Sequence, residues 1–416
     1  MDSGAQPVPF LRRVHIRGFR SVRDAEVTFG PLTVLLGLNG AGKSNLLDGV
    51  RFVRDALAST PGHAVVDRQG PAVVLHRGES PAGPRRLSLE LDLDVRAPRT
   101  PGEPEPEGLS ASYAFQLRLD EGAATGTVIE HERCTVTSTE TGVSTGYQVH
   151  DGRVVEGPDH LMGPITDATT LFLPAAARWP PFAPVHTALR GMAFQTLDTA
   201  AMRPARLLLR SGQPVLDPAG ERIAEVLDRL TSRYPLAKRR VDDYLGAILP
   251  GALGIDALTV DDYQTLRLRM ADPDAEHGMR SFSAAAMSDG TLAAAGLLTA
   301  LFQPATWTGA VPLVAVEDPE LGLHAAAIGA LFDALIEASD HVQVIVATQS
   351  ADLLDREDFP LDATRIVTAD KGATIVTMVD DTIRQVVHRR LASLGELQRS
   401  NQLTPWPDGT DPGRTP

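Results

Sequence analysis

The chain has 416 residues, which is too long for one small domain and suits one large domain or two lobes. Its hydrophobic fraction of 43% and charged fraction of 22% are typical of a soluble globular protein. The formal net charge of −14 excludes a surface that attracts nucleic acid as a whole, so any DNA contact must come from a local basic patch.

Three features predict a cytoplasmic protein without a membrane partner. No apolar run approaches the roughly 18–20 residues of a membrane helix. The N-terminus lacks the basic-then-apolar pattern of a signal peptide. The single cysteine, Cys134, cannot form an internal disulfide, which fits a reducing compartment. We expect residues 1–8 to be a disordered lead and 404–416 a disordered tail.

Residues 9–188 are expected to form an N-terminal lobe that contains an antiparallel β-layer. Apolar and basic residues nearly alternate over 10–16, and apolar and polar residues alternate strictly over 86–95. Both patterns are typical of strands with one face exposed to solvent. Further strands are expected over 110–119 and 127–138, which makes an antiparallel layer the simplest interpretation.

Within this lobe, residues 33–50 combine an apolar run, a glycine-rich turn and a helical pattern. The turn reads G-x-x-x-x-G-K-S in the strand–loop–helix setting that this phosphate-binding motif requires. Its glycines let backbone N–H groups converge on a polyphosphate, and the helix N-terminus adds partial positive charge. The alternative is a glycine-rich connector that binds nothing, which the complete motif disfavours.

We therefore predict a site for ATP and Mg²⁺ at this turn. The Lys43 ammonium is expected to reach the β- and γ-phosphates, and the Ser44 hydroxyl to ligate Mg²⁺. The predicted nucleotide-contacting residues of the loop are Gly37, Asn39, Gly40, Ala41, Gly42, Lys43, Ser44 and Asn45.

Residues 189–270 are interpreted as a mainly helical insertion, with two short strands expected over 258–270. The insertion holds the best local candidates for a DNA contact. These basic residues are Arg203, Arg206, Arg210, Lys238, Arg239 and Arg240. Ordinary solvated helix faces are an equally good interpretation, since the chain as a whole is acidic.

Residues 271–403 are expected to form a C-terminal lobe in which strands and helices alternate. The pattern predicts a helix over 289–302, buried strands over 312–316 and 342–347, and a terminal helix over 382–397. Strands that alternate with helices imply a mostly parallel sheet with both faces covered.

Two adjacent carboxylates, Glu317 and Asp318, follow the first of these buried strands. A phosphate loop needs such acidic residues on a neighbouring strand before it can hydrolyse ATP. We expect Glu317 to orient Mg²⁺ or its waters, and Asp318 to position and deprotonate the attacking water. The alternative is a solvated acidic strand end.

Together these motifs resemble the ABC-type ATPase head of the SMC, RecF/RecN and OLD families. The resemblance is greatest to the stand-alone bacterial AAA-family ATPases of that group, and it covers roughly residues 10–180 and 270–380. The matching segments are GFRS at 18–21, the loop 37–44, MSDGT at 287–291, EDPELGLH at 317–324 and TQS at 348–350. It implies an α/β P-loop NTPase fold with a mostly parallel sheet, an antiparallel β-layer and a helical insertion.

The resemblance also implies roles for further residues. Ser288 and Gly290 resemble the ABC signature, which touches the γ-phosphate held by the other subunit, and so imply an ATP-gated homodimer. An ordinary helix N-cap is the alternative for Ser288. Arg20 resembles the arginine of the family's turn near the nucleotide, with a plain surface arginine as the alternative. Gln349 stands where the family usually has a catalytic switch histidine.

The chain departs from the family in ways that bear on activity. Asp318 is one methylene shorter than the usual glutamate, which implies slow turnover. Gln349 can hydrogen-bond a phosphate or water but cannot carry a proton at neutral pH. We expect no coiled-coil arm, because no long coiled coil is present, and no metal-binding nuclease domain in the stretch after residue 380. His324 is interpreted as a structural or dimer-contacting residue, because no second His or Cys lies at ligand spacing.

The implied function is slow Mg²⁺-dependent ATP hydrolysis in DNA repair or anti-phage defence, beside a separately encoded nuclease or effector. The first alternative is a switch or scaffold that binds ATP, hardly hydrolyses it and gates a partner. The second is the ATP-binding subunit of a transporter. Against it stand the β-layer, the insertion and the absence of an L-S-G-G-Q signature.

Overall fold

The computed structural model describes residues 8–77, 85–96, 107–119, 126–159, 161–162, 167–208, 214–356, 359–400 and 402–403. Within these ranges, no helix has the length and apolar character needed to cross a bilayer. The expected disordered ends lie outside the described residues, except for Val8.

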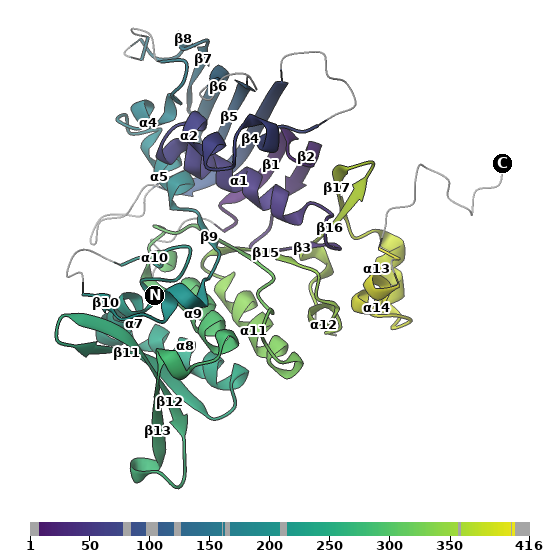
Figure 1. The fold of residues 1–416 in the computed structure, drawn as a ribbon. Coiled ribbons are helices and arrows are strands. Elements are labelled where there is room, and N and C mark those ends of the chain that lie inside the picture. The colour runs from purple at the N-terminus through teal and green to yellow at the C-terminus, as the bar shows by residue number, and fades with distance from the viewer. Residues whose placement is uncertain are drawn as a thin grey trace.

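The N-terminal β-layer is a seven-stranded sheet in the order β2-β1-β4-β5-β6-β7-β8, and neighbouring strands are antiparallel (Figure 1). Its strands are β1 Leu11–Phe19, β2 Val22–Thr28, β4 Arg85–Arg96, β5 Gly108–Leu119, β6 Thr127–Ser138, β7 Ser144–His150 and β8 Arg153–Glu156. Alternate residues of β4 are fully buried, so the period-2 pattern of the sequence marks the covered face correctly.

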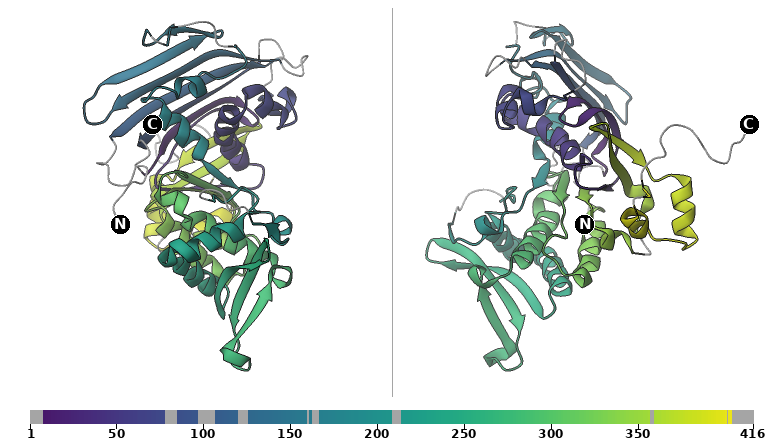
Figure 2. Two further views of the ribbon diagram at one scale, coloured as in Figure 1. Left: turned by 90° about the vertical axis from the view of Figure 1, so that its left-hand side faces the viewer. Right: turned by 45° about the vertical axis from the view of Figure 1, so that its right-hand side comes forward.

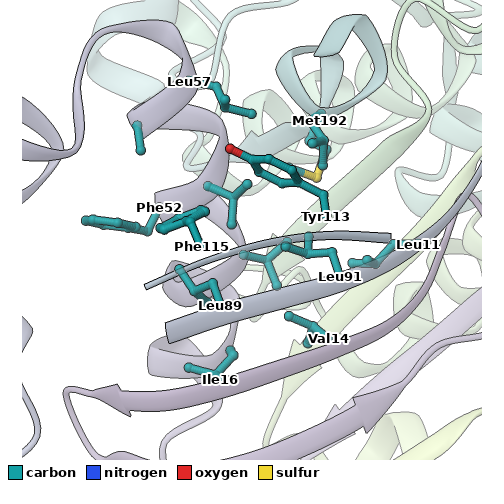
Figure 3. Packing of buried hydrophobic residues seen from close by; sticks show 14 of the residues in the cluster. Leu11, Val14, Ile16, Phe52, Leu57, Leu89, Leu91, Tyr113, Phe115 and Met192 are labelled. Carbon is teal, nitrogen blue, oxygen red and sulfur yellow. The ribbon is translucent and has the colours of Figure 1, made fainter. Parts of the chain in front are cut away.

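Helices cover the buried face of this layer. They are α1 Lys43–Ala58, α2 Pro61–Val66, α3 Pro71–Val74, α4 Leu173–Ala176 and α5 Ala183–Gly191. Figure 3 shows the resulting core, in which Phe52 of α1 lies against Phe115 of β5, with Leu89 and Leu91 of β4 nearby. The ring centroids of Phe52 and Phe115 are 6.4 Å apart.

The central sheet has the order β17-β16-β3-β15-β14-β9, and its strands are parallel except for β17. The strands are β3 Leu32–Leu36, β9 Ala193–Gln195, β14 Leu313–Glu317, β15 Gln343–Thr348, β16 Thr364–Asp370 and β17 Ala373–Met378. Every residue of β3 and β15 is buried, as expected for parallel strands covered on both faces.

Alternate side chains of the central sheet pack into two different cores. Leu35 and Ile345 belong to the cluster that includes α1, whereas Val34 and Val344 belong to the cluster that includes α9 Asp289–Phe302 and α11 Ala325–Ala338. The sheet therefore lies between the upper helices and the lower ones (Figure 1).

The stretch 189–270 contains more strand than expected. Its first strand, β9, joins the central sheet, and β10 Arg206–Leu207, β11 Ala252–Val260 and β12 Tyr263–Ala271 form a second antiparallel sheet with β13 Met279–Ser283. This sheet projects from the lower end of the molecule (Figure 2). Its helices are α6 Thr199–Met202, α7 Ile223–Arg233 and α8 Pro235–Ile248. The boundaries of the insertion stay a prediction.

The expected terminal helix over 382–397 is wrong, because two helices occupy this region: α13 Asp381–His388 and α14 Leu394–Arg399. Arg390 has a φ of 54°, which ends helical geometry between them. Ser393 then starts α14 through a capping box with Glu396. The remaining short helices are α10 Pro304–Trp307, α12 Ala351–Leu354, η1 Glu276–Gly278, η2 Ala284–Ala286 and η3 Leu361–Ala363.

One buried carboxylate, Glu132 of β6, connects the β-layer to α4. It accepts hydrogen bonds from the hydroxyls of Tyr113 (3.1 Å) and Tyr147 (2.9 Å) and from the backbone N–H groups of Phe172 (2.5 Å) and Leu173 (2.9 Å). Burial raises the pKa of Glu132, while the donors act in the opposite direction. The four donors would have no acceptor in the core without it.

Replacing Glu132 with alanine should lower the free energy of unfolding by at least about 3 kcal/mol, because four buried donors lose their acceptor. Tyr113→Phe removes one of the four hydrogen bonds and should cost about 1 kcal/mol. The measurement is urea unfolding followed by circular dichroism. Equal unfolding midpoints for the wild type and both variants would contradict this account of the core.

Candidate nucleotide-binding site

The predicted site motifs meet at one edge of the central sheet. Gly37 follows β3, Asp318 follows β14 and Gln349 follows β15, and these three parallel strands are neighbours. The backbone N–H of Gly37 donates to the carbonyl of Thr348 (3.4 Å), and that of Asp318 donates to Ala347 (2.7 Å). The carboxyl edge of a parallel sheet is where such folds usually bind ligands.

Close packing requires two of the loop glycines. A Cβ at Gly37 would lie 2.2 Å from the carbonyl oxygen of Val367, and one at Gly42 would lie 1.9 Å from Oγ1 of Thr374. Gly42 also has a φ of 103°, which side chains rarely allow. Strands β16 and β17 therefore hold the loop from one side, while Asn39 and Gly40 are exposed and Ala41 is buried.

Lys43 begins α1, and only 8% of the residue is exposed. Its ammonium donates to the carbonyl oxygens of Gly37 (2.7 Å) and Leu38 (3.2 Å), so it lies inside the loop that it follows. Burial lowers the pKa of Lys43, and Asp318, Glu317 and Glu320 act in the opposite direction. No side chain caps the start of α1, so its first N–H groups are available to a ligand. These N–H groups and the Lys43 ammonium both lie at the phosphate loop.

The two predicted metal ligands touch each other. The Ser44 hydroxyl donates a hydrogen bond to Glu317, which joins the start of α1 to the end of β14. Among the described residues, Oδ1 of Asp318 and Oε2 of Glu320 are buried and have no hydrogen-bond partner. Unpartnered carboxylate oxygens in the residues directly after Glu317 suit a hard divalent cation, which would neutralise them.

The described residues contain no group of three or more His, Cys, Asp or Glu side chains that could hold a metal alone. Mg²⁺ commonly binds to one or two protein ligands and completes its shell with water and phosphate oxygens. The residues present therefore fit Mg²⁺ that arrives with a nucleotide.

The sequence alone suggests no role for Glu320, although this residue lies in the segment 317–324 that resembles the family. The Thr348 hydroxyl at the end of β15 donates to it, and burial raises the pKa of Glu320. The signal in the sequence was a third carboxylate, three residues after Glu317. Gln349 lies at the same edge, where its backbone carbonyl accepts a hydrogen bond from the amide of Gln398 on α14 (2.9 Å).

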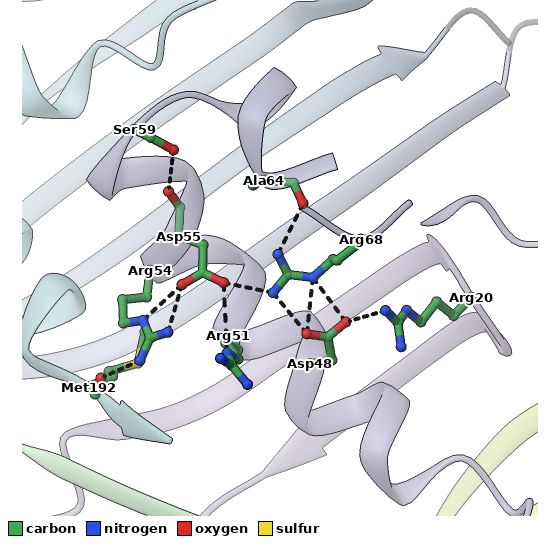
Figure 4. A network of polar contacts seen from close by, with 9 residues as sticks. All are labelled: Arg20, Asp48, Arg51, Arg54, Asp55, Ser59, Ala64, Arg68 and Met192. Carbon is green, nitrogen blue, oxygen red and sulfur yellow. Dashed lines mark hydrogen bonds and ion pairs between the residues drawn. The ribbon is translucent and has the colours of Figure 1, made fainter. Parts of the chain in front are cut away.

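Arg20 is tied to the phosphate-loop helix by the polar network of Figure 4. It forms an ion pair with Asp48 of α1 (3.0 Å), and a further nitrogen lies 3.5 Å from the side-chain oxygen of Asn45. Arg68 holds the same carboxylate from the other side, at 2.8 Å. The amide of Asn45 in turn donates to the Ser21 hydroxyl (2.6 Å). Arg20 is therefore not a plain surface arginine, and its contact with nucleotide stays a prediction.

Ser288 and Gly290 both have structural roles within one chain. The Ser288 side chain caps α9 by accepting from the backbone N–H of Thr291 (3.1 Å). A Cβ at Gly290 would lie 2.2 Å from the carbonyl oxygen of Gly322, so the first turn of α9 packs on the loop after β14. His324 caps α11 by accepting from Ala326 (3.2 Å). The contact of Ser288 with a nucleotide across a dimer stays a prediction.

Two members of the predicted DNA-binding cluster are structural, which corrects that expectation. Lys238 is buried, and its ammonium pairs with Asp242 (2.6 Å) and Asp256 (3.2 Å). Arg203 pairs with Asp289 (2.6 Å) and also donates to backbone carbonyls. Neither side chain is free to meet a phosphate backbone.

The other members differ in exposure. Arg206 pairs with Glu221 (2.9 Å). Arg239 and Arg240 lie on the outer face of α8 with side chains that are 79% and 59% exposed, in ion pairs with Asp243 and Glu337. Arg210 lies outside the described residues. Among the described members of this cluster, Arg239 and Arg240 on the exposed face of α8 are the remaining candidates for a nucleic-acid contact.

Two family models match parts of the chain. A model described as "AAA domain, putative AbiEii toxin, Type IV TA system" matches residues 198–355, and one described as "AAA domain" matches residues 13–56. Together they include the phosphate loop, the segment 287–291 and the strand that ends in Glu317.

Curated relatives match over short stretches. The DNA replication and repair protein RecF of Synechococcus sp. (strain JA-2-3B'a(2-13)) is 36% identical over 86 residues, which is 20% of this chain and 23% of that protein. RecF of Magnetococcus marinus (strain ATCC BAA-1437 / JCM 17883 / MC-1) is 32% identical over 111 residues, 26% of this chain and 28% of that protein. The chain thus spans about a quarter of the length of these relatives.

Among solved structures, an SMC head bound to the C-terminal winged-helix domain of ScpA is similar over 90% of this chain and 99% of that one. Its TM-score is 0.53 and its sequence identity is 15%. At this identity the similarity concerns the fold alone.

Replacing Lys43 with alanine should weaken the binding of Mg-ATP by at least about tenfold, because charge-assisted hydrogen bonds to phosphate are lost. Isothermal titration calorimetry measures the affinity. Lys371→Asn is the matched control: the chain has three lysines, and Lys371 is exposed in the turn between β16 and β17. Wild-type affinity in Lys43→Ala, or an equal loss in the control, would refute the assignment of the loop.

Proposed function

We propose that this chain, whose fold is that of an ABC/SMC-type ATPase head, hydrolyses ATP with Mg²⁺ and works as an ATP-gated homodimer. The observation that supports this most is the meeting of Lys43, Ser44, Glu317 and Asp318 at one edge of a parallel sheet. A cation, uncapped helix N–H groups, a hydroxyl and carboxylates are the parts that phosphoryl transfer to water requires.

Each side chain has a chemical task in this proposal. Lys43 and the N–H groups of the loop would bind the phosphates, and Ser44 and Glu317 would hold Mg²⁺, which would supply positive charge to the transferred phosphoryl group. Asp318 orients the attacking water and accepts its proton, and Gln349 hydrogen-bonds the water or the γ-phosphate. The shorter reach of Asp318 makes hydrolysis slow.

A nearly inactive ATP-binding switch is the second candidate, and the same two residues favour it. Asp318 is short for a general base, and Gln349 cannot transfer a proton at neutral pH. A single-turnover assay with Mg-ATP separates the two: an ATPase converts the bound nucleotide to ADP within a turnover time, whereas a switch retains it.

The proposal of a dimer rests on the resemblance of Ser288 and Gly290 to the ABC signature. Ser288 and the start of α9 present a hydroxyl and helix N–H groups, which suit an anion supplied by a second copy. Each nucleotide would lie between the phosphate loop of one copy and the signature of the other. Hydrolysis then removes the phosphate that joins the halves.

The cellular role is proposed as DNA repair or anti-phage defence. The names of the RecF relatives support the first, and the toxin–antitoxin description of the matching model supports the second. In either role the ATP-driven dimer gates a partner, which we propose to be DNA or a separately encoded nuclease or effector.

Asp318→Asn should accumulate a closed dimer, because it removes the base and keeps the ligands for Mg-ATP. Turnover should fall by about a hundredfold or more, the usual worth of a positioned general base. Light scattering should show a dimer that depends on Mg-ATP, since a ligand stabilises the state that it binds better. Adding Ser288→Arg should return the protein to a monomer. A monomer under every condition, or a dimer indifferent to ATP and to Ser288→Arg, would rule out the ATP sandwich.

If DNA binds to the outer face of α8, replacing Arg239 and Arg240 with glutamate should weaken DNA binding and flatten its salt dependence. Their exposed ion pairs contribute little to stability, so the fold should survive. The control is Arg153→Glu with Arg190→Glu, the same charge change at exposed positions of β8 and α5. Fluorescence anisotropy at several salt concentrations measures both. Equal affinity and salt slope in the two double variants would assign these arginines to a solvated face.

A further inference from the structure

The segment that begins at Asp198 braces the loop before α9. Asp198 caps the short helix α6 by accepting from the backbone N–H groups of Ala200 (2.9 Å) and Ala201 (3.3 Å). The Thr199 hydroxyl donates to Oδ1 of Asp289 (2.8 Å). Arg203, directly after this helix, reaches the same carboxylate oxygen.

The Arg203 guanidinium donates hydrogen bonds to several acceptors in loop 284–289. One terminal nitrogen donates to the carbonyl oxygens of Ala284 (2.8 Å) and Met287 (2.9 Å) and lies 3.4 Å from that of Ala285. The other donates to Asp289 at 2.6 Å. A planar group with two terminal donor nitrogens spans these positions, and the single ammonium of lysine does not. The loop thus reaches Ser288 in a fixed conformation.

Arg203 also neutralises the negative charge of Asp289 at the helix N-terminus where an anion would bind. Asp289 is the first residue of α9, beside Ser288, and its side chain is 75% exposed. An unpaired carboxylate there would repel a phosphate group that approaches the helix N-terminus. The hydrogen bond from Arg203 holds the pKa of Asp289 below its usual value, as expected for a paired carboxylate.

We propose that Arg203 is a positioning residue for the signature: it fixes loop 284–289 and neutralises Asp289, so that Ser288 and the start of α9 can receive the nucleotide phosphate of a second copy. This inference rests on the proposed ATP sandwich. It gives Arg203 a role in dimer closure in place of a contact with DNA.

The test uses the full chain with Asp318→Asn as the parent. Arg203→Met and Arg203→Lys are compared with Arg206→Met, a control three residues further on, whose side chain pairs with Glu221 and donates to the carbonyl of Ala201 (3.1 Å) rather than to loop 284–289. Calorimetry measures Mg-ATP binding to the monomer, and light scattering measures the ATP-dependent dimerisation constant. Arg203→Met should weaken dimerisation by about tenfold or more, since several charge-assisted bonds are lost, and leave nucleotide affinity within about twofold. Arg203→Lys should be intermediate, and Arg206→Met should match the parent.

A charge rescue distinguishes positioning from a general loss of structure. Asp289→Asn added to Arg203→Met removes the uncompensated carboxylate, so it should restore part of the dimerisation and make the remainder less dependent on salt. Dimerisation of Arg203→Met at the parent's level overturns the inference and leaves the proposed function standing. Loss of nucleotide binding in that variant, or no rescue by Asp289→Asn, also overturns it. A parent that binds Mg-ATP but stays monomeric overturns the ATP sandwich and this inference with it.

Discussion

The parallel pairing of β3, β15 and β14 is the constraint on which the rest of the structure depends. Leu36 is paired with Thr348, and Glu317 with Ala347, so the three strands end within about a residue of one another. A shift of one residue in this register would turn the buried side chains of a strand to the opposite core. The same register brings the phosphate loop, the carboxylates and Gln349 to one edge. The same strand register therefore determines both the packing of the sheet and the assembly of the site.

Other elements hold the loop in place from outside this sheet. Thr374 at the start of β17 lies where a side chain on Gly42 would be, and its hydroxyl is 2.6 Å from that of Ser21. Its backbone N–H donates to the carbonyl of Ser21 (2.8 Å). The turn that carries Arg20, the phosphate loop and the edge strand β17 thus interlock, although they come from opposite ends of the chain. Nucleotide binding is expected to be sensitive to substitutions in all three segments.

Local patterns in the sequence predicted most of the fold and the strand ends that meet at the candidate site. The fold class and the resemblance to ABC/SMC-type heads are confirmed, and the helix over 289–302 and the strand that ends at Glu317 occur where expected. Contacts between distant residues could not be predicted. Arg203 meets a loop more than 80 residues further along the chain, and its charge alone suggested a DNA contact. The first half of β11 is not predicted from the sequence, because Gly251 and Gly254 interrupt the strand pattern there and the strand has a bulge between Ala252 and Gly254.

The central claim is that Lys43, Ser44 and Glu317 bind the phosphates and Mg²⁺ of one nucleotide. The most direct measurement is a crystal structure of the chain with Mg²⁺ and a non-hydrolysable ATP analogue. We expect the Lys43 ammonium to leave the carbonyls of Gly37 and Leu38 for the β- and γ-phosphates, and Mg²⁺ to separate Ser44 from Glu317. A nucleotide bound elsewhere, or one bound at this edge while Lys43 keeps its two carbonyl contacts and Ser44 its bond to Glu317, would contradict the account.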